Sequence, residues 1–311
     1  VEAAASIGVD AVKFQIHIAK AESSKLEPFR VNFSYQDTTR FDYWKRMEFN
    51  ESDWKGIKKK CDDLNVEFLA TPFSLAAVDL LEKLRVKRYK IGSGDASNLL
   101  LLEKIAKTNK EVIISSGLGT LDELDKSVSF LKSKNIPFVI MQCTTKYPTN
   151  ANEIGLEWLS ILKEQFQCPI GFSDHSGEIF PSLGAVSLGA EVIEAHITFD
   201  KQMFGPDSKA SLDVGDFKRM VDGIRFLEVA RGKGLDKKSN NNKDELRRIF
   251  GRAIGINKKL LAGHIITFED LEIKKPSNAG ISVNEYKKVI GMRLVENKNA
   301  WEFLNYEDLK Q

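Results

Sequence analysis

Short apolar segments alternate with amphipathic segments along most of the chain. The apolar segments have the length of strands and lie at residues 11–16, 66–71, 88–93, 111–117, 138–143, 169–175 and 192–199. The amphipathic segments have helical periodicity and lie at residues 51–64, 75–84, 99–108, 121–132 and 156–165. Regular alternation of this kind predicts an α/β fold with a parallel sheet connected by crossover helices.

The predicted strands number one fewer than the eight of a (β/α)8 TIM barrel. Residues 1–8 have the pattern of a helix end followed by a terminating glycine, Gly8, so we expect an earlier strand to precede them. We therefore predict a TIM barrel whose first strand is missing from this chain. An open, doubly wound sheet is the alternative.

The pattern changes near Arg231. The next residues are polar, highly charged and without periodicity, which is typical of a linker. The remainder of the chain contains short strands and turns, and it is small for an independent core. We predict a catalytic barrel over residues 1–231, a linker over residues 232–248 and a β-rich domain over residues 249–311 that leans on the barrel or on another subunit.

Composition narrows the classes of partner. The 46 basic and 44 acidic residues give a net charge of +2, which supports neither nucleic acid nor an anionic membrane as a partner. No apolar run approaches the ~20 residues that span a bilayer, and no signal peptide is visible. Cys61, Cys143 and Cys168 have no CxxC spacing and lie in or beside apolar segments. We expect free thiols and a cytoplasmic protein.

Polar residues gather at the C-terminal ends of the predicted strands. They are Lys13, Gln15, Thr71, Lys90, Ser93, Ser115, Ser116, Gln142, Thr144, Thr145, Asp174, His175 and His196. Capping explains a polar residue at one strand end, but not at seven ends in succession. In a barrel these ends form the active face, so we predict a site there.

Two of the four histidines, His175 and His196, end adjacent strands. Equivalent ends of neighbouring parallel strands converge, so the two imidazoles should meet at one point. Imidazole suits Mn, Zn, Fe, Co or Ni better than Mg or Ca, and Asp174 and Glu194 supply nearby carboxylates. Two hydrogen-bonded structural histidines are the alternative.

Lys90, Ser93 and Gly94 end one strand, and Ser115 and Gly117 end the next. A lysine, hydroxyls and free backbone amides together suit a phosphate group. Ordinary turns after a strand are one alternative, and a Schiff-base lysine at Lys90 is another. The neighbouring hydroxyls favour the phosphate.

Taken together, these segments resemble the sialic acid synthase family, whose members condense phosphoenolpyruvate with an N-acetylated hexosamine to give a nine-carbon 2-keto sugar acid. The matching segments are residues 11–15, 70–74, 90–94, 142–148, 171–176, 194–196 and 205–207. The segments that resemble the family's antifreeze-like (SAF) domain are residues 254–271, 274–276 and 289–291. The likeness covers essentially the whole chain in order.

The resemblance implies a role for each matching residue. It makes His175 and His196 the ligands of a divalent metal, Mn2+ or Mg2+. The residues it assigns to catalysis are Lys13, Glu194 and His196. The residues it places around phosphoenolpyruvate are Lys13, Thr71, Lys90, Ser93, Ser115 and Ser173. The residues it assigns to the sugar and the rest of the substrate site are Gln15, Thr145, Tyr147, Asp207 and Lys275.

The resemblance also implies a reaction and an assembly. Phosphoenolpyruvate, water and an N-acyl hexosamine such as N-acetylmannosamine would give the sugar acid and phosphate, with the metal polarising the sugar aldehyde. The expected assembly is a homodimer with exchanged C-terminal domains. Each domain would cover the partner's barrel mouth and bring Lys275 near the sugar.

Departures from the family pattern leave the identity of the sugar open. The chain lacks the family's Asn-His-Asn-Gly-like motif, and Lys275 and Ser208 stand where arginine and histidine are common. Legionaminate and pseudaminate are alternative products. A Schiff-base aldolase using Lys90 and a non-catalytic carbohydrate-binding protein are alternatives from other classes. The aromatic and basic insert at residues 29–46 is a lid, an oligomer contact or a solvated loop.

Overall fold

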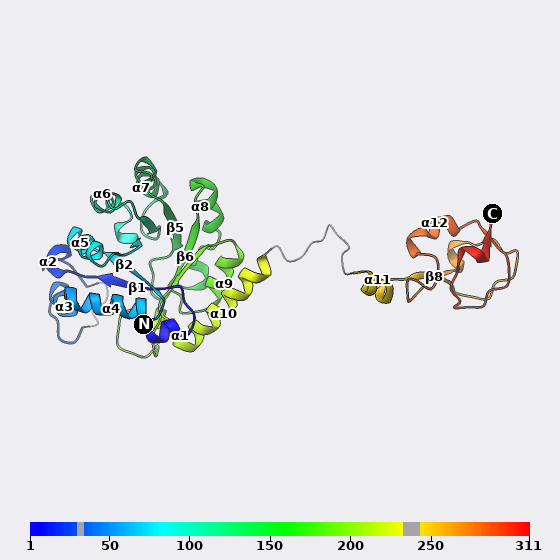
Figure 1. Ribbon diagram of the computed structural model, residues 1–311, viewed down its shortest axis with the longest axis horizontal. Coiled ribbons are helices and arrows are strands. Elements are labelled where there is room, and N and C mark those ends of the chain that lie inside the picture. The colour runs from blue at the N-terminus through cyan, green and yellow to red at the C-terminus, as the bar shows by residue number, and fades with distance from the viewer. Residues whose placement is uncertain (30–33, 233–242) are drawn as a thin grey trace. The chain divides into compact units, whose positions relative to one another are not determined.

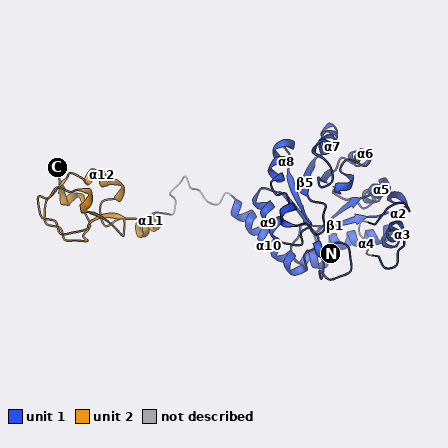
Figure 2. Ribbon diagram, turned by 180° about the vertical axis from the view of Figure 1, so that it is seen from behind, with its two compact units in different colours: residues 1–232 blue, residues 233–311 orange. Residues whose placement is uncertain are grey.

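The computed structural model describes residues 1–29, 34–232 and 243–311 (Figure 1). The chain forms two compact units, Val1–Gly232 and Lys233–Gln311 (Figure 2). Residues 30–33 of the predicted insert and residues 233–242 of the predicted linker lie outside the described residues. The last part of the predicted linker is helical, because α11 (Asp244–Phe250) begins there.

The described part of the first unit contains parallel strands that alternate with helices. The strands are β1 (Ala11–Ile16), β2 (Glu67–Pro72), β3 (Arg88–Ile91), β4 (Glu111–Ser115), β5 (Phe138–Cys143), β6 (Ile170–Asp174) and β7 (Val192–Ala195). The α-helices between and after them are α2 (Ala19–Glu22), α3 (Arg40–Met47), α4 (Glu51–Asp63), α5 (Leu75–Lys83), α6 (Leu99–Ala106), α7 (Leu121–Ser133), α8 (Trp158–Phe166), α9 (Phe180–Ser187) and α10 (Val214–Arg231). The seven predicted strands are therefore all present, with ends that differ by a few residues.

Local sequence explains where these helices begin and end. The Asn50 side chain caps α4 in a capping box, and the Ser74 hydroxyl caps α5. The turn after α4 places Asn65 in the left-handed region at φ 54°, which asparagine tolerates well. The first helix, α1 (Glu2–Ser6), is followed by Gly8 at φ 83°, as the glycine stop predicted.

The strands form a parallel half-barrel. β3 to β7 pair in chain order, β1 pairs with β2, and β2 lies beside β3. A cavity of about 900 Å³ is lined by β1 and β7, the two strands at the ends of this series. The predicted alternation of strands and helices thus gives a curved parallel sheet with its helices packed on the outside.

Side chains alternate between the two faces of this sheet. Leu69, Ile113 and Met141 belong to one apolar cluster, whereas their neighbours Ile114 and Ile140 belong to the larger core under the helices. The positions two residues further along β2, β4 and β5 are Thr71, Ser115 and Cys143. They share the face of the smaller cluster, so a layer of polar side chains follows the apolar layer at the C-terminal ends of the strands.

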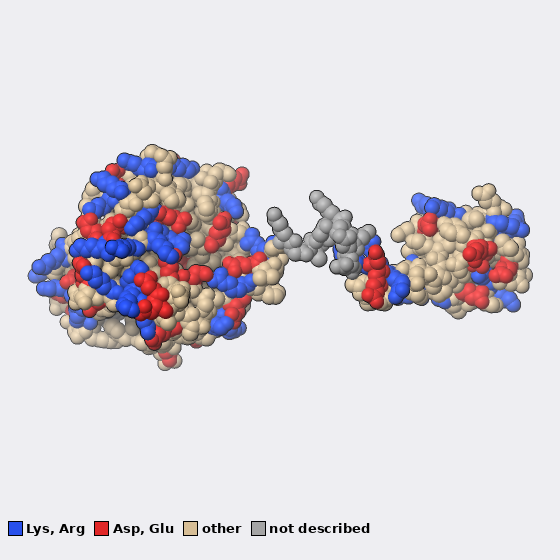
Figure 3. Space-filling view, viewed as in Figure 1, with Lys and Arg blue, Asp and Glu red and all other residues tan. Residues whose placement is uncertain are grey.

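Charges of both signs are spread over the visible face of the first unit (Figure 3). Within the described ranges, no helix is long and apolar enough to cross a membrane. Cys61, Cys143 and Cys168 are free thiols, which confirms the prediction from their spacing.

The C-terminal unit consists of short strands and turns. Strand β8 (Ala253–Ile256) pairs antiparallel with β9 (Leu271–Lys274), and β10 (Arg293–Leu294) pairs antiparallel with β11 (Leu309–Lys310). Its buried apolar core consists of Ile254, Ile256, Leu260, Ile266, Ile281, Val289, Leu294, Leu304 and Leu309. A core this small leaves the unit dependent on its polar contacts.

Asp270 is the buried charge that organises one side of the C-terminal unit. Its Oδ1 lies 2.7 Å from Lys258 Nζ. Its Oδ2 lies 2.8 Å from His264 Nε2 and accepts hydrogen bonds from the backbone N–H and the hydroxyl of Thr267, both at 2.9 Å. Burial raises the pKa of Asp270, but hydrogen bonds from Lys258, His264 and Thr267 outweigh burial and hold the pKa below its usual range.

We expect Asp270→Asn to lower the free energy of unfolding of the C-terminal unit by about 2–4 kcal/mol, because Lys258 then faces an uncharged amide. Because the folded pKa is depressed, the stability from the carboxylate is present above the unfolded pKa of about 3.9 and is lost as pH falls below it. Urea denaturation of the full chain from pH 7 to pH 3 measures both effects. Equal stability of the variant and the wild type over this range would contradict the expectation.

Candidate active site

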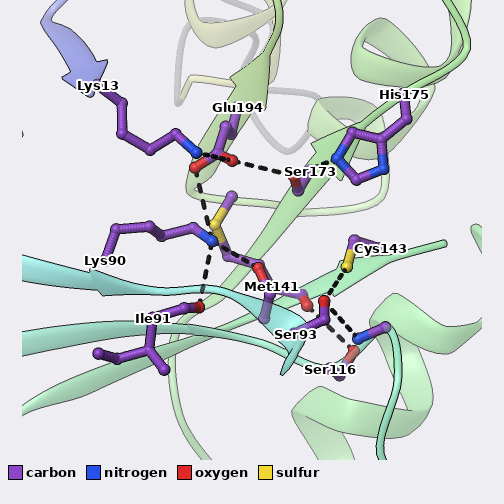
Figure 4. A network of polar contacts seen from close by, with 12 residues as sticks. Lys13, Lys90, Ile91, Ser93, Ser116, Met141, Cys143, Ser173, His175 and Glu194 are labelled. Carbon is purple, nitrogen blue, oxygen red and sulfur yellow. Dashed lines mark hydrogen bonds and ion pairs between the residues drawn. The ribbon is translucent and has the colours of Figure 1, made fainter. Parts of the chain in front are cut away.

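Inward polar side chains of β1, β3, β6 and β7 meet around the carboxylate of Glu194 (Figure 4). Lys13 Nζ lies 2.9 Å from Glu194 Oε1, and Lys90 Nζ lies 3.7 Å from Oε2. The Ser173 hydroxyl donates a hydrogen bond to Oε1 at 3.2 Å. The structure thus brings together four predicted site residues that are far apart in the sequence.

The charges of this cluster are enclosed. The side chain of Lys90 is only 3% exposed and that of Glu194 only 13%. Burial raises the pKa of Glu194, but the ammonium groups of Lys13 and Lys90 outweigh burial and hold the pKa well below its usual range. Burial lowers the pKa of Lys90, and Glu194 opposes that shift. Two amino groups thus face one carboxylate, so the cluster suits a further anion.

A second group of polar atoms lies beside Lys90. Lys90 Nζ donates a hydrogen bond to Ser115 Oγ at 2.6 Å. Ser93 Oγ accepts a hydrogen bond from the Gly117 N–H at 3.1 Å and lies 3.0 Å from Cys143 Sγ. A Cβ atom at Gly117 would lie 2.5 Å from Cys143 Sγ, so only glycine permits this approach of the backbone.

Two buried hydroxyl oxygens of predicted substrate-binding residues, Thr71 Oγ1 and Thr145 Oγ1, have no hydrogen-bond partner among the described residues. An unpaired buried hydroxyl costs about 1–3 kcal/mol, and native proteins usually pair such groups with protein, water or ligand. Both hydroxyls are therefore available to a ligand oxygen.

His175 and His196 lie side by side, with ring centroids 5.3 Å apart. His175 Nδ1 lies 2.7 Å from the carbonyl oxygen of Thr144, which can only accept, so Nδ1 carries the proton and Nε2 is unprotonated. The Tyr147 hydroxyl lies 3.2 Å from this Nε2. Burial lowers the pKa of both histidines, that of His196 to about 4 with help from Lys13, so both imidazoles are neutral at pH 7.

Carboxylates add little to this histidine pair. In the part of the chain that the structure describes, no group of three or more His, Cys, Asp or Glu residues is arranged to hold a metal ion. Asp174 instead accepts hydrogen bonds from the backbone N–H and the hydroxyl of Ser176, at 2.8 and 3.1 Å. The two imidazoles could hold a metal only if other ligands, such as water or substrate, complete its coordination.

The remaining predicted residues fall in two places. Gln15 and Asp207 line the cavity between β1 and β7 together with Lys13 and His196. Lys275 belongs to the C-terminal unit, where its ammonium group lies over the ring of Phe250 at 5.2 Å.

Cys143 is a residue of this face that the sequence analysis did not place in the site, because it considered the cysteines only as free thiols. Cys143 is buried, and its sulfur contacts Ser93 in the polar layer. The alternation along β5 was the available signal, since Val139, Met141 and Cys143 share one face of the strand.

Known proteins resemble this chain over most of its length. The profile of the NeuB family matches residues 1–236. The N,N'-diacetyllegionaminic acid synthase of Campylobacter jejuni is 36% identical over 305 residues, which cover 96% of this chain and 90% of that protein. The human N-acetylneuraminate-9-phosphate synthase is 29% identical over 292 residues, which cover 93% of this chain and 81% of that protein.

A solved structure supports the same relationship. The N-acetylneuraminic acid synthetase of Leptospira borgpetersenii, in complex with citrate, superimposes with a TM-score of 0.69 at 29% identity, covering 79% of this chain and 82% of that chain. The inward lysines, the paired histidines and these likenesses lead to one conclusion. This chain belongs to the NeuB family of sialic acid and related nonulosonate synthases.

Proposed function

We propose that the protein condenses phosphoenolpyruvate with an N-acyl hexosamine and water, giving a nine-carbon 2-keto sugar acid and phosphate. The observation that carries the proposal is the enclosed cluster of Lys13, Lys90 and Glu194 beside unpaired hydroxyls. A net positive charge in such a place suits a small molecule with both a phosphate and a carboxylate. N-acetylmannosamine is the first acceptor to consider, and the hexoses that lead to legionaminate or pseudaminate are the alternatives.

Phosphoenolpyruvate would lie across the two lysines. Lys90, Ser93 and Ser115 would bind its phosphate, because the ends of two neighbouring strands hold these groups, with Lys90 bonded to Ser115 and Ser93 bonded to the Gly117 N–H. Lys13 and the unpaired hydroxyl of Thr71 would bind its carboxylate. Glu194 and Ser173 would hold the lysine side chains in position, since a charge that is fixed in advance needs no reorganisation during reaction.

The sugar would lie toward the histidines. Gln15 and Asp207 line the cavity beside His196, and Tyr147 contacts His175. The Thr145 hydroxyl supplies a further unpaired hydrogen-bonding group. These groups would orient the open-chain aldehyde toward the nucleophilic carbon of phosphoenolpyruvate, and the enclosed site would limit the access of bulk water.

We also propose that His175 and His196 hold a divalent metal, Mn2+ or Mg2+. The donor set fits, because both imidazoles are neutral and the Thr144 carbonyl fixes the His175 tautomer with Nε2 unprotonated. When bound, such a metal polarises the carbonyl oxygen of an aldehyde. The neighbouring Tyr147 hydroxyl would help to orient that oxygen.

We propose that the half-barrel is part of a (β/α)8 TIM barrel. Part of the lining of the cavity between β1 and β7, away from Gln15, His196 and Asp207 in the proposed sugar site, is apolar and includes Leu69, Ile113, Val192 and Met220. This lining and the two flanking strands suit one further parallel strand, which would close the sheet.

For the C-terminal unit we propose a SAF-type domain that covers the barrel mouth of a second copy in a homodimer. Two observations support this role: Phe250 is 63% exposed and Ile273 is 56% exposed, although both are large and apolar. They flank Lys275, the residue proposed to reach the partner's sugar.

The function is tested by following phosphate release from phosphoenolpyruvate with a panel of N-acyl hexosamines, with and without Mn2+. Release that depends on the acceptor supports the synthase. A Schiff-base aldolase would instead be trapped on Lys90 by borohydride with pyruvate, and a non-catalytic binding protein would release no phosphate. The hydrogen bonds that Lys90 Nζ donates to Ser115 and to the Ile91 carbonyl support a binding role for this lysine over a Schiff base.

Lys90→Ala should raise the KM for phosphoenolpyruvate far more than the KM for the sugar. The loss of a charge-assisted contact costs about 1.5–3 kcal/mol, which corresponds to roughly 10- to 150-fold. Lys87→Ala is the matched control, because Lys87 is exposed and directly precedes the opposite end of the strand that carries Lys90. A selective loss of sugar affinity in Lys90→Ala would overturn the assignment.

His196→Ala should nearly abolish activity and weaken Mn2+ binding while the fold persists. Calorimetric titration with Mn2+ measures the affinity, and circular dichroism melting checks the fold. If Mn2+ binds the variant as tightly as the wild type, His196 is not a ligand.

Mixing two inactive full-length variants should restore activity if the C-terminal unit acts on its partner. One variant carries His196→Ala and the other Lys275→Glu. In the mixed dimer, one site combines an intact barrel with an intact C-terminal unit, so refolded mixtures should recover up to about a quarter of wild-type activity. Heterodimers that form but show no more activity than their parents would argue that each tail serves its own barrel.

A further inference from the structure

The hydroxyl group of Ser93 has two neighbours that together decide how it can meet a ligand. A serine hydroxyl offers one O–H donor and two acceptor lone pairs. One lone pair accepts the Gly117 N–H at 3.1 Å. Among the described residues, the only other partner of this oxygen is Cys143 Sγ at 3.0 Å (Figure 4). The action of Ser93 toward a ligand therefore depends on whether oxygen or sulfur donates its hydrogen to the other.

Cys143 is placed to serve this hydroxyl and not to fill the apolar core. It ends β5 and is only 5% exposed, yet it belongs to none of the apolar clusters formed by the described residues. A Cβ atom on Gly117 would lie 2.5 Å from the sulfur and 2.9 Å from Ser93 Oγ. Glycine at this position thus lets the thiol, the hydroxyl and the backbone N–H come together.

An anion beside Ser93 would change the direction of the bond between oxygen and sulfur. The Ser93 O–H makes a stronger hydrogen bond to a charged phosphate oxygen than to a sulfur atom, which is a weak acceptor. Once the O–H has turned to the anion, the second lone pair of the oxygen needs a donor. The thiol S–H of Cys143 is in place to supply it.

A hydroxyl whose two lone pairs are both occupied can act toward a ligand only as a donor. The Gly117 N–H and the Cys143 S–H would fill the two lone pairs, so no lone pair of Ser93 would face the anion. Donors that are set before the ligand arrives need no reorganisation when it binds. Without the thiol, the hydroxyl would be free to rotate, and a lone pair directed at the anion would repel it.

We propose that Cys143 is a positioning residue for phosphate binding. Its thiol donates to Ser93 Oγ and thereby holds the Ser93 hydroxyl as a donor to the phosphate of phosphoenolpyruvate. The inference rests on the proposed function, because it takes the anion beside Lys90 and Ser93 to be a phosphate group. It adds to that function a residue that acts through its neighbour and not through the substrate.

Calorimetric titration of the purified full chain with inorganic phosphate tests the proposal, because this anion can bind without turnover. Cys143→Ala should raise the Kd about threefold to tenfold, as expected for the loss of one hydrogen bond. Cys143→Ser keeps a donor and should stay within about twofold of wild type. Cys143→Val fills the volume of the sulfur without a donor and should repeat the alanine result, even where the alanine variant fails to fold. Cys168→Ala is the matched control, because Cys168 precedes β6 at the opposite end of the sheet.

A double-mutant cycle with Ser93→Ala shows whether the thiol acts through the hydroxyl. Ser93→Ala already lacks the group that Cys143 positions, so adding Cys143→Ala should raise the Kd by less than about a further twofold. In steady-state kinetics, Cys143→Ala should raise the KM for phosphoenolpyruvate and change kcat and the KM for the sugar by less than about twofold. Circular dichroism melting checks the fold of each variant.

The outcomes separate this inference from the proposed function. The role of Cys143 fails if Cys143→Val binds phosphate as tightly as the wild type, if Cys143→Ser binds it as weakly as Cys143→Val, or if the losses add in the double variant. It also fails if both KM values rise equally or if the wild type binds no phosphate. A wild type that binds phosphate but releases none from phosphoenolpyruvate with any acceptor would overturn the proposed function alone, and the Kd values would still decide the inference.

Discussion

The ion pairs that the Glu194 carboxylate forms with Lys13 and Lys90 are the interaction on which the rest of the site depends. Enclosing an ammonium group without a counter-charge costs several kcal/mol, so neither lysine could lie in this layer alone. Glu194 stands on β7 and Lys13 on β1, the strands at the two ends of the sheet series. In the described residues no backbone pairing joins these strands, so the ion pair links the two sides of the cavity and fixes the distance between them.

Neutral histidines next to charged lysines follow from the same cluster. A positive imidazole beside Lys13 would add a like charge in an enclosed place, and burial and Lys13 together lower the pKa of His196 to about 4. The site is therefore divided into a half with two lysines that suits an anion and a half with two neutral imidazoles. One carboxylate placed on β7 suffices for this division, because it neutralises only one of the two lysines.

Much of this arrangement could be predicted from the sequence. Strands buried on both faces appear as continuous apolar runs, and the polar residues that end them, such as Lys90 and His175, indicate which end of the sheet carries the candidate site. The strand ends were less predictable. The last strand was expected to continue to residue 199, but β7 stops at Ala195. Beyond it the chain leaves the sheet, and Ile197 bridges to Leu212 instead.

Contacts between distant segments explain what the sequence could not predict. No local pattern indicates that His17 lies between Trp44 and Phe73, because each ring belongs to a different connection. The Thr144 carbonyl that fixes the His175 tautomer is a backbone group, so the type of residue at this position does not reveal it. Side-chain identity thus predicts which groups reach the active face. The connections after the strands fold over that face. Their arrangement decides where protons lie and which side chains surround the site, and therefore which substrates can fit.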